Sequence, residues 1–176
     1  MNSTHDATSP PREQQLLNQG ARLLANGEAR LAIPLLERAY QTDAQSVLIL
    51  INLGAAYTLA GRHREAVPLL ETARDLEPHN PMVWGNLGAA YLGNPILATG
   101  GQQLRAIDAF ETALELDPAS PNVHYNLGLI YVDRAEHDLA IAAFRRAAEI
   151  DPADRDARRW LDTIEAKVEG EPNHGP

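Results

Sequence analysis

The six histidines are the residues of this sequence that could bind a metal ion or transfer a proton. None of them lies in an HExxH motif or in any comparable ligand spacing. His63 and His137 fall near expected turns and His79 follows Pro78, which predicts solvated loop positions. The chain contains no cysteine, and this excludes a thiolate zinc site, an iron–sulfur cluster, a disulfide framework and a thiol nucleophile.

Other residue types that could support catalysis also lack the required arrangement. Gly100 and Gly101 are not followed by the Lys-Ser/Thr of a phosphate-binding loop, and no strand precedes them. Carboxylates gather at expected helix ends, as in Asp75 and Glu77, which is typical of solvated surface. We therefore expect a protein that is not an enzyme and that uses no metal and no cofactor.

Charge and hydropathy narrow the class of partner. The net charge of −9 and the pI near 5.0 argue against nucleic acid, because binding to phosphates requires a cationic surface. The first twelve residues are polar and do not resemble a signal peptide, and no window has the roughly 18 apolar residues of a membrane helix. These features predict a soluble, cytoplasmic protein without membrane insertion.

Four asparagines are spaced along the chain at a regular interval, and only the last interval is longer. The members of this asparagine column are Asn18, Asn52, Asn86 and Asn126. Asparagine is a poor residue for a helix interior, so four placements at one position indicate a task. Two hypotheses remain open: the amides bind a partner, or they bond to neighbouring helices of the scaffold.

The column belongs to an internal repeat. The segment Asn-Leu-Gly-x-x-Tyr occurs three times, and each copy is followed by Ala, Leu or Phe, Ala and Pro at matching distances. The repeat period equals the interval from Asn52 to Asn86, and the third copy carries an insertion of six between Tyr91 and Ala106. A weaker fourth copy precedes these three. Its more polar residues are expected of a first repeat, because no upstream repeat covers it.

Each repeat predicts two antiparallel helices, since apolar residues recur at spacings of three and four, as in Leu50, Leu53 and Tyr57. The abundance of alanine and leucine favours an all-α fold. Gly54 and Gly128 lie within the first helices, at a cost of ~1 kcal/mol relative to alanine. We expect a neighbouring helix to pack against the bare backbone at these glycines and to offset this loss of stability.

The repeat resembles the tetratricopeptide repeat, whose pattern is W-x₂-L-G-x₂-Y followed by A-x₃-F-x₂-A and P, with a period of about 34 residues. Trp84, Leu87, Gly88 and Tyr91 match the first part in full, whereas the last repeat has His124 at the tryptophan position. The resemblance implies an all-α superhelix, or solenoid, of helix pairs. It also implies a concave groove lined by the first helices, and a general role in protein binding.

The expected organisation is four helix-turn-helix repeats with a C-terminal capping helix. The repeats are 13–46, 47–80, 81–120 (with the insertion) and 121–154, followed by the capping helix at 155–169, and the tails at 1–12 and 170–176 are expected to be disordered. The amphipathic segment at 155–169 either covers the last apolar layer or docks a partner. The insertion, within 92–105, is either a loop for specificity or assembly or a tolerated variation in length.

The neighbours of the asparagine column predict an apolar, nearly uncharged groove, of the kind that is usually occupied. The apolar positions are Leu48, Ile51, Met82, Tyr125 and Leu129. In several tetratricopeptide proteins the asparagine at this place bonds the backbone of a bound peptide. Neither Lys nor Arg occupies the places flanking Asn52 or Asn86, so a carboxylate clamp for chaperone C-termini is not expected.

The sequence thus predicts a non-catalytic adaptor that binds an apolar peptide or helix of a partner protein in its groove. Two alternatives stay open. The protein could be a structural subunit that forms homo-oligomers through the groove or the insertion, or it could be an accessory domain of a larger enzyme or assembly complex.

Overall fold

The structure is a computed structural model that describes residues 12–95 and 97–170. All regular secondary structure in this part of the chain is α-helical. The helices are α1 (Arg12–Ala25), α2 (Ala29–Thr42), α3 (Val47–Leu59), α4 (His63–Leu76), α5 (Pro81–Leu92), α6 (Gly100–Leu116), α7 (Pro121–Asp133), α8 (His137–Ile150) and α9 (Arg155–Gly170). Among these residues no helix combines the length and the apolar character needed to cross a membrane. The tails expected to be disordered lie outside the described residues, apart from the helical Arg12 and Gly170.

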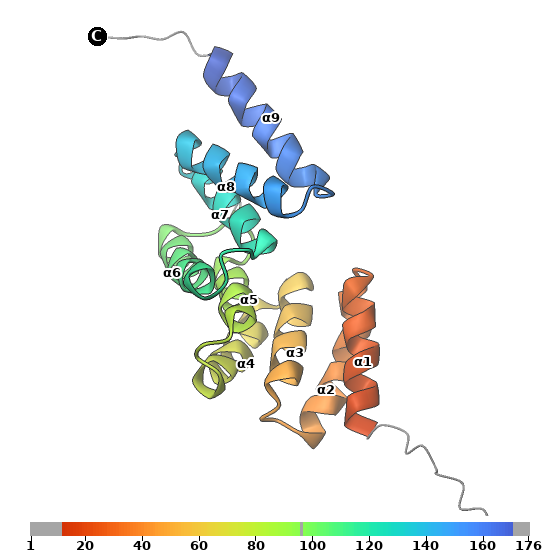
Figure 1. Cartoon of the computed structure of the whole chain (residues 1–176). Coiled ribbons are helices and arrows are strands. Elements are labelled where there is room, and N and C mark those ends of the chain that lie inside the picture. Colours follow the sequence, from red (N-terminus) through yellow and green to blue (C-terminus); the bar gives the residue numbers. More distant parts are fainter. Residues whose placement is uncertain (1–11, 96, 171–176) are drawn as a thin grey trace, which may run out of the picture. The chain divides into compact units, whose positions relative to one another are not determined.

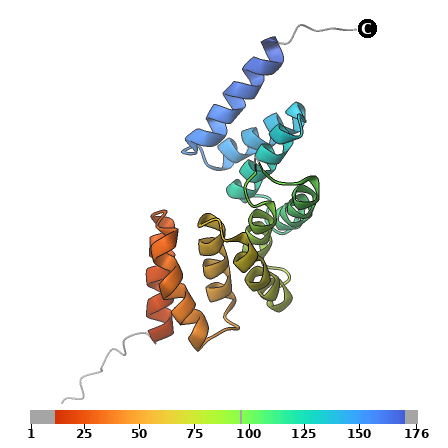
Figure 2. The same ribbon diagram turned by 180° about the vertical axis from the view of Figure 1, so that it is seen from behind.

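The chain divides into two compact units, the first ending at Leu76 and the second beginning at Glu77. Unit 1 contains the hairpins α1–α2 and α3–α4, and α3 also packs against α1 and α2 (Figure 1). Unit 2 contains the hairpins α5–α6 and α7–α8. In unit 2, α9 packs against α8 and extends beyond it, as the view from behind also shows (Figure 2).

Three hairpin turns share one backbone geometry. Gly27, Gly61 and Ala135 occupy equivalent positions with φ angles of 77°, 77° and 57°. The next residue in each turn donates its backbone N–H to the carbonyl five residues before it, at 2.7 to 2.8 Å. This bond closes the first helix of the hairpin and sets the direction of the second. Ala135 adopts the left-handed conformation that glycine reaches without steric cost.

The inserted residues of the third hairpin are divided between a turn and a longer helix. The helix α6 has 17 residues, whereas α8 has 14. Thr99 caps it through a reciprocal pair of hydrogen bonds with Gln102. Gln103 is buried and donates from Nε2 to Asp133 Oδ2 at 2.7 Å. This bond ties the start of α6 to the end of α7 within unit 2.

Each hairpin is built around a glycine in its first helix that faces a large side chain of its second helix. A Cβ added at these glycines would lie far too close to that side chain: 2.5 Å at Gly20–Leu36, 2.6 Å at Gly54–Leu70, 2.6 Å at Gly88–Phe110 and 2.7 Å at Gly128–Phe144. The expectation that a helix packs against the bare backbone is therefore confirmed.

A cluster in unit 1 joins the end of α3 to α2 and α4. Tyr57 donates its hydroxyl to Glu37 Oε1 at 2.6 Å, and the guanidinium carbon of Arg62 lies 4.2 Å from the Tyr57 ring centroid. Arg62 also donates from Nε to Glu65 at 3.0 Å. Burial, followed by the hydrogen bond and the charge of Glu37, raises the pKa of Tyr57 to about 12.

Replacement of Gly128 by alanine tests the close contact between the two helices of a hairpin. We expect Gly128→Ala to lower the free energy of unfolding by about 1–3 kcal/mol, because Phe144 has to move away from the new methyl group. Gly101→Ala is the matched control, since its Cβ would meet no atom within 4 Å. That control should be neutral, or stabilising by up to ~1 kcal/mol. Urea unfolding measures both, and equal shifts in the two variants would contradict the packing argument.

The raised pKa of Tyr57 predicts a dependence of stability on pH. A folded-state pKa above the ordinary value of 10.0 means that the phenol contributes its full stability below pH 10, and that this contribution is lost as the pH rises through about 12. The difference in urea midpoint between the wild type and Tyr57→Phe should therefore shrink over this range. A difference that stays constant to the top of the range would show that the Tyr57 pKa is not raised by folding.

Candidate peptide-binding site

Three members of the asparagine column adopt the same side-chain arrangement. The Nδ2 of Asn52 donates to the Leu48 carbonyl at 2.7 Å, and the Nδ2 of Asn86 donates to the Met82 carbonyl at 2.8 Å. Asn126 donates to the carbonyl of Asn122 at 2.8 Å. Each amide thus bonds to the carbonyl four residues earlier in its own helix, and this bond fixes the direction of the amide.

This arrangement leaves polar atoms for a ligand. An asparagine amide has two N–H donors and an acceptor oxygen, and the internal bond uses one donor. Within the described residues, no hydrogen bond reaches the Oδ1 of Asn52, Asn86 or Asn126. Asn18 differs, because its Oδ1 accepts from Gln14 Nε2 at 3.0 Å.

The apolar residues predicted beside the column differ in exposure. Leu48 and Met82 are 56% and 57% exposed, and each lies one helical turn before a column asparagine. Ile51, in contrast, is 3% exposed and belongs to the core. Gly85, one repeat after Ile51, also lies against a helix, because a Cβ added at Gly85 would be 3.3 Å from the Val123 side chain of α7. This place in the repeat therefore offers little free surface, although sequence alone put it in the groove.

In unit 2 the column residues lie on two helices that touch, since Gly85 of α5 meets Val123 of α7. We call the face of α5 and α7 that carries Met82, Asn86, Asn122, Asn126 and Leu129 the asparagine face of unit 2. Tyr125 and Leu129 are half-buried and pack against the Phe144 cluster. In unit 1, Asn52 and Leu48 lie together on α3, and Asn18 lies on α1.

The helix α9 adds residues that sequence reasoning had not assigned to the site. A pocket of 450 Å³, which we call the α9 pocket, is lined by Tyr125, Asp156, Arg159, Trp160 and Thr163. Arg159 and Trp160 stand one repeat period after Tyr125 and Asn126. Buried residues follow the same rule, because Ala157 and Ile164 correspond to Val123 and Ile130. The period itself could have identified α9 as a further first helix rather than as a cap alone.

The aromatic walls of the α9 pocket are fixed by the fully buried Phe144. The Tyr125 ring meets Phe144 edge-on with centroids 5.6 Å apart, and the Trp160 ring stacks on Phe144 at 5.9 Å. Burial raises the pKa of Tyr125, with smaller contributions in the same direction from the charges of Asp156 and Asp154. The phenol therefore remains neutral at physiological pH.

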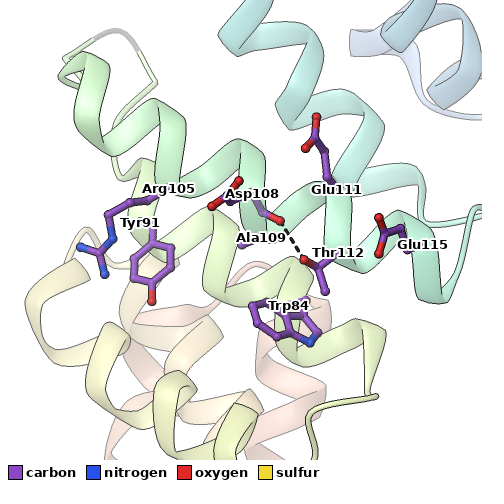
Figure 3. Close-up of a pocket in the computed structure, with 8 residues that line it drawn as sticks. All are labelled: Trp84, Tyr91, Arg105, Asp108, Ala109, Glu111, Thr112 and Glu115. Carbon is purple, nitrogen blue, oxygen red and sulfur yellow. Dashed lines mark hydrogen bonds between the residues drawn. The ribbon is translucent and has the colours of Figure 1, made fainter.

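A second pocket, of 530 Å³, lies on another face of unit 2 between α5 and α6 (Figure 3). Its aromatic wall consists of Trp84 and Tyr91, and the guanidinium carbon of Arg105 lies 3.9 Å from the Tyr91 ring centroid. Its carboxylates come from Asp108, Glu111 and Glu115, and in Figure 3 they point in different directions. Since they do not converge on one point, this pocket is a weaker candidate than the asparagine face.

The tryptophan position of the repeat has a structural task that His124 also performs. Trp84 Nε1 donates to the Pro78 carbonyl at 2.7 Å, and His124 Nε2 lies 3.1 Å from the Pro118 carbonyl. Both bonds reach six residues back and hold the preceding loop against the helix. In the described part of the chain, no cluster of three or more His, Asp or Glu side chains is arranged to hold a metal ion.

Three profiles of one repeat family match the chain. Tetratricopeptide repeat profiles match residues 23–85 and 121–154, and a TPR repeat profile matches residues 96–133. The chain belongs to the tetratricopeptide repeat family. Proteins of this family are generally non-catalytic scaffolds, and the chain is accordingly a protein-interaction scaffold. None of the curated proteins matches the tetratricopeptide chain in sequence.

Solved structures show the same fold. TTC0263 of Thermus thermophilus is 24% identical with a TM-score of 0.78, over 89% of this chain and 82% of that one. A mutant of MamA is 30% identical with a TM-score of 0.56, over 84% and 81% of the two chains. A chain of the APC/C hetero-tetramer Cut9–Hcn1 is 24% identical with a TM-score of 0.72, over 86% of this chain and 30% of that one. The expected all-α tetratricopeptide fold is confirmed.

Replacement of Asn86 by alanine separates a structural role from a binding role. Alanine loses one hydrogen bond to the Met82 carbonyl but is the better helix former, so we expect the free energy of unfolding to change by less than ~0.5 kcal/mol. Asn80→Ala is the control, because Asn80 caps α5 by accepting from the Met82 N–H at 3.0 Å. That control should cost about 1 kcal/mol. A loss in Asn86→Ala as large as in Asn80→Ala would assign the column to the scaffold.

Proposed function

We propose that this protein is an adaptor in which the asparagine face of unit 2 docks an apolar segment of a partner protein. The observation that supports this proposal is the shared arrangement of Asn86 and Asn126. Each amide keeps one N–H and its Oδ1 for a ligand, and the internal bond holds both in place. An extended backbone carries matching acceptors and donors.

The apolar residues of this face supply burial. Met82 is 57% exposed, so its thioether side chain loses water when a partner covers it. Leu129 and Tyr125 present their free sides next to Asn126 and are held from behind by the Phe144 cluster. The five residues that define this face are uncharged, and burial against them therefore favours an apolar segment over a strongly charged one.

Unit 1 offers the same chemistry on α3. Asn52 and the exposed Leu48 repeat the arrangement of Asn86 and Met82, and Ile51 supports them from the core. The Oδ1 of Asn18 becomes available to a ligand when the exposed hydrogen bond from Gln14 Nε2 breaks. We assign these residues to the same function.

The test uses a phage-displayed library of random dodecapeptides, panned on the full chain. Peptides that are enriched are synthesised, and their affinities are measured by calorimetry. We expect Asn86→Ala together with Asn126→Ala to weaken binding by about 10- to 100-fold, because up to four hydrogen bonds are lost while the fold stays intact.

Gln41→Ala is the matched control, since it removes an exposed amide of α2 that is not part of the asparagine column. Unchanged affinity in the double variant, or a library that enriches no peptide, would remove the proposal. Light scattering of the unliganded chain at two concentrations accompanies the titrations. A mass that rises with concentration would favour the alternative in which copies associate through exposed residues of the inserted segment, where Leu97 is 77% exposed.

A further inference from the structure

We propose that the α9 pocket recognises an acidic side chain next to an aromatic side chain within the docked segment. The aromatic ring packs against Trp160 and Tyr125, and the neighbouring Asp or Glu pairs with Arg159. This inference rests on the proposed function, because the pocket adjoins the asparagine face at Tyr125. It specifies which partner residues bind at this end of the face.

The walls of the pocket are ready for an aromatic ring before any ligand arrives. Trp160 is stacked on Phe144 with an interplanar angle of 6°, and Tyr125 meets the same ring at 70°. Phe144 has no exposed surface and supports both rings from behind. Rigid aromatic walls lose little conformational entropy on binding, and buried aromatic contacts dominate the energetics of many interfaces.

The charges of the pocket select an acidic neighbour. Asp156 lies in the first turn of α9, where the helix N-terminus stabilises a carboxylate. Arg159 lies further along the helix and is exposed, and its guanidinium has no hydrogen bond or ion pair with any residue in the described ranges. A guanidinium binds a carboxylate through two parallel N–H donors. Asp156 and Arg159 therefore place opposite charges in the pocket, and Arg159 is the group that can pair with an acidic side chain, while the helix N-terminus offsets part of the Asp156 charge.

The carboxylate is that of a side chain rather than of a chain terminus. A terminal carboxylate is captured either by a clamp of several cationic side chains or by a group of free backbone N–H donors, and Arg159 is the one cationic residue in the lining of this pocket. At the start of α9 these donors are occupied, because the N–H groups of Asp156 and Ala157 bond to Asp154 Oδ1 at 2.9 and 3.0 Å. Arg159 alone remains, and a flexible Asp or Glu side chain can reach it while the segment continues along the face.

The experiment uses the same phage-displayed library, in which the peptide C-terminus is fused and not free. We expect the enriched peptides to carry Asp or Glu within two residues of Phe, Tyr or Trp. Affinities of acetylated and amidated peptides are then measured from Trp160 fluorescence in Trp84→Phe, a background that removes the other tryptophan of the chain. Arg159→Glu should weaken binding by about 10-fold or more.

Arg158→Glu is the matched control, because it makes the same charge change on the adjacent exposed residue of α9, which does not line the pocket. That control should leave the affinity unchanged within about twofold. A peptide with Lys in place of its acidic residue should bind Arg159→Glu more tightly than it binds the wild type. Enrichment of basic peptides, or equal effects of the two arginine variants, would overturn the inference. A peptide with a free C-terminus that binds about 10-fold more tightly than its amide would overturn it as well.

The two proposals fail in different ways. Loss of affinity in Asn86→Ala with Asn126→Ala, but not in Arg159→Glu, keeps the docking face and removes the pocket. Loss in Arg159→Glu alone keeps the pocket and removes the amides. Trp160→Ala, measured by calorimetry because it removes the fluorophore, should also weaken binding, with circular dichroism showing that the helix content is unchanged.

Discussion

The contact between a bare glycine and a large side chain organises each of the four hairpins in the described part of the chain. At Gly88 and Gly128 the missing Cβ leaves room for a phenylalanine ring that would otherwise overlap it. The contact fixes the rotation of the first helix about its axis. Since a residue turns the helix by about 100°, the asparagine two positions before each glycine points about 200° away, to the opposite side. The core contact thus explains why the column faces outward in both units.

Much of the fold follows from the sequence because the repeat couples local pattern to packing. The repeat period predicts helix pairs, and apolar spacing predicts which sides meet. The substitution of His124 for tryptophan did not disturb this, because both rings reach a carbonyl six residues back. The length of α6 was less predictable. Its extension depends on Thr99 as a cap and on a bond from Gln103 to Asp133, a residue 30 positions away.

The candidate site was only partly predictable, for physical reasons. The column could be read from spacing, but the rotamer that gives Asn86 an internal bond depends on its own helix backbone. Ile51 was expected on a free surface although it is buried, since hydropathy does not distinguish an apolar residue in a groove from one between helices. Sequence alone placed Trp160 and Arg159 in an amphipathic segment that either covers the last apolar layer or docks a partner, because a solenoid needs a terminal helix over that layer.

The internal hydrogen bond shared by Asn52, Asn86 and Asn126 has a consequence for signalling. Because one donor of each of these amides is already bonded to the helix backbone, filling or emptying the proposed docking face requires no rotation of the amide and no rearrangement of the helices beneath it. A ligand bound at this face would then leave the conformation of the rest of the molecule unchanged. A scaffold of this kind brings partners together by proximity, and does not transmit the arrival of one partner as a change of shape felt by another.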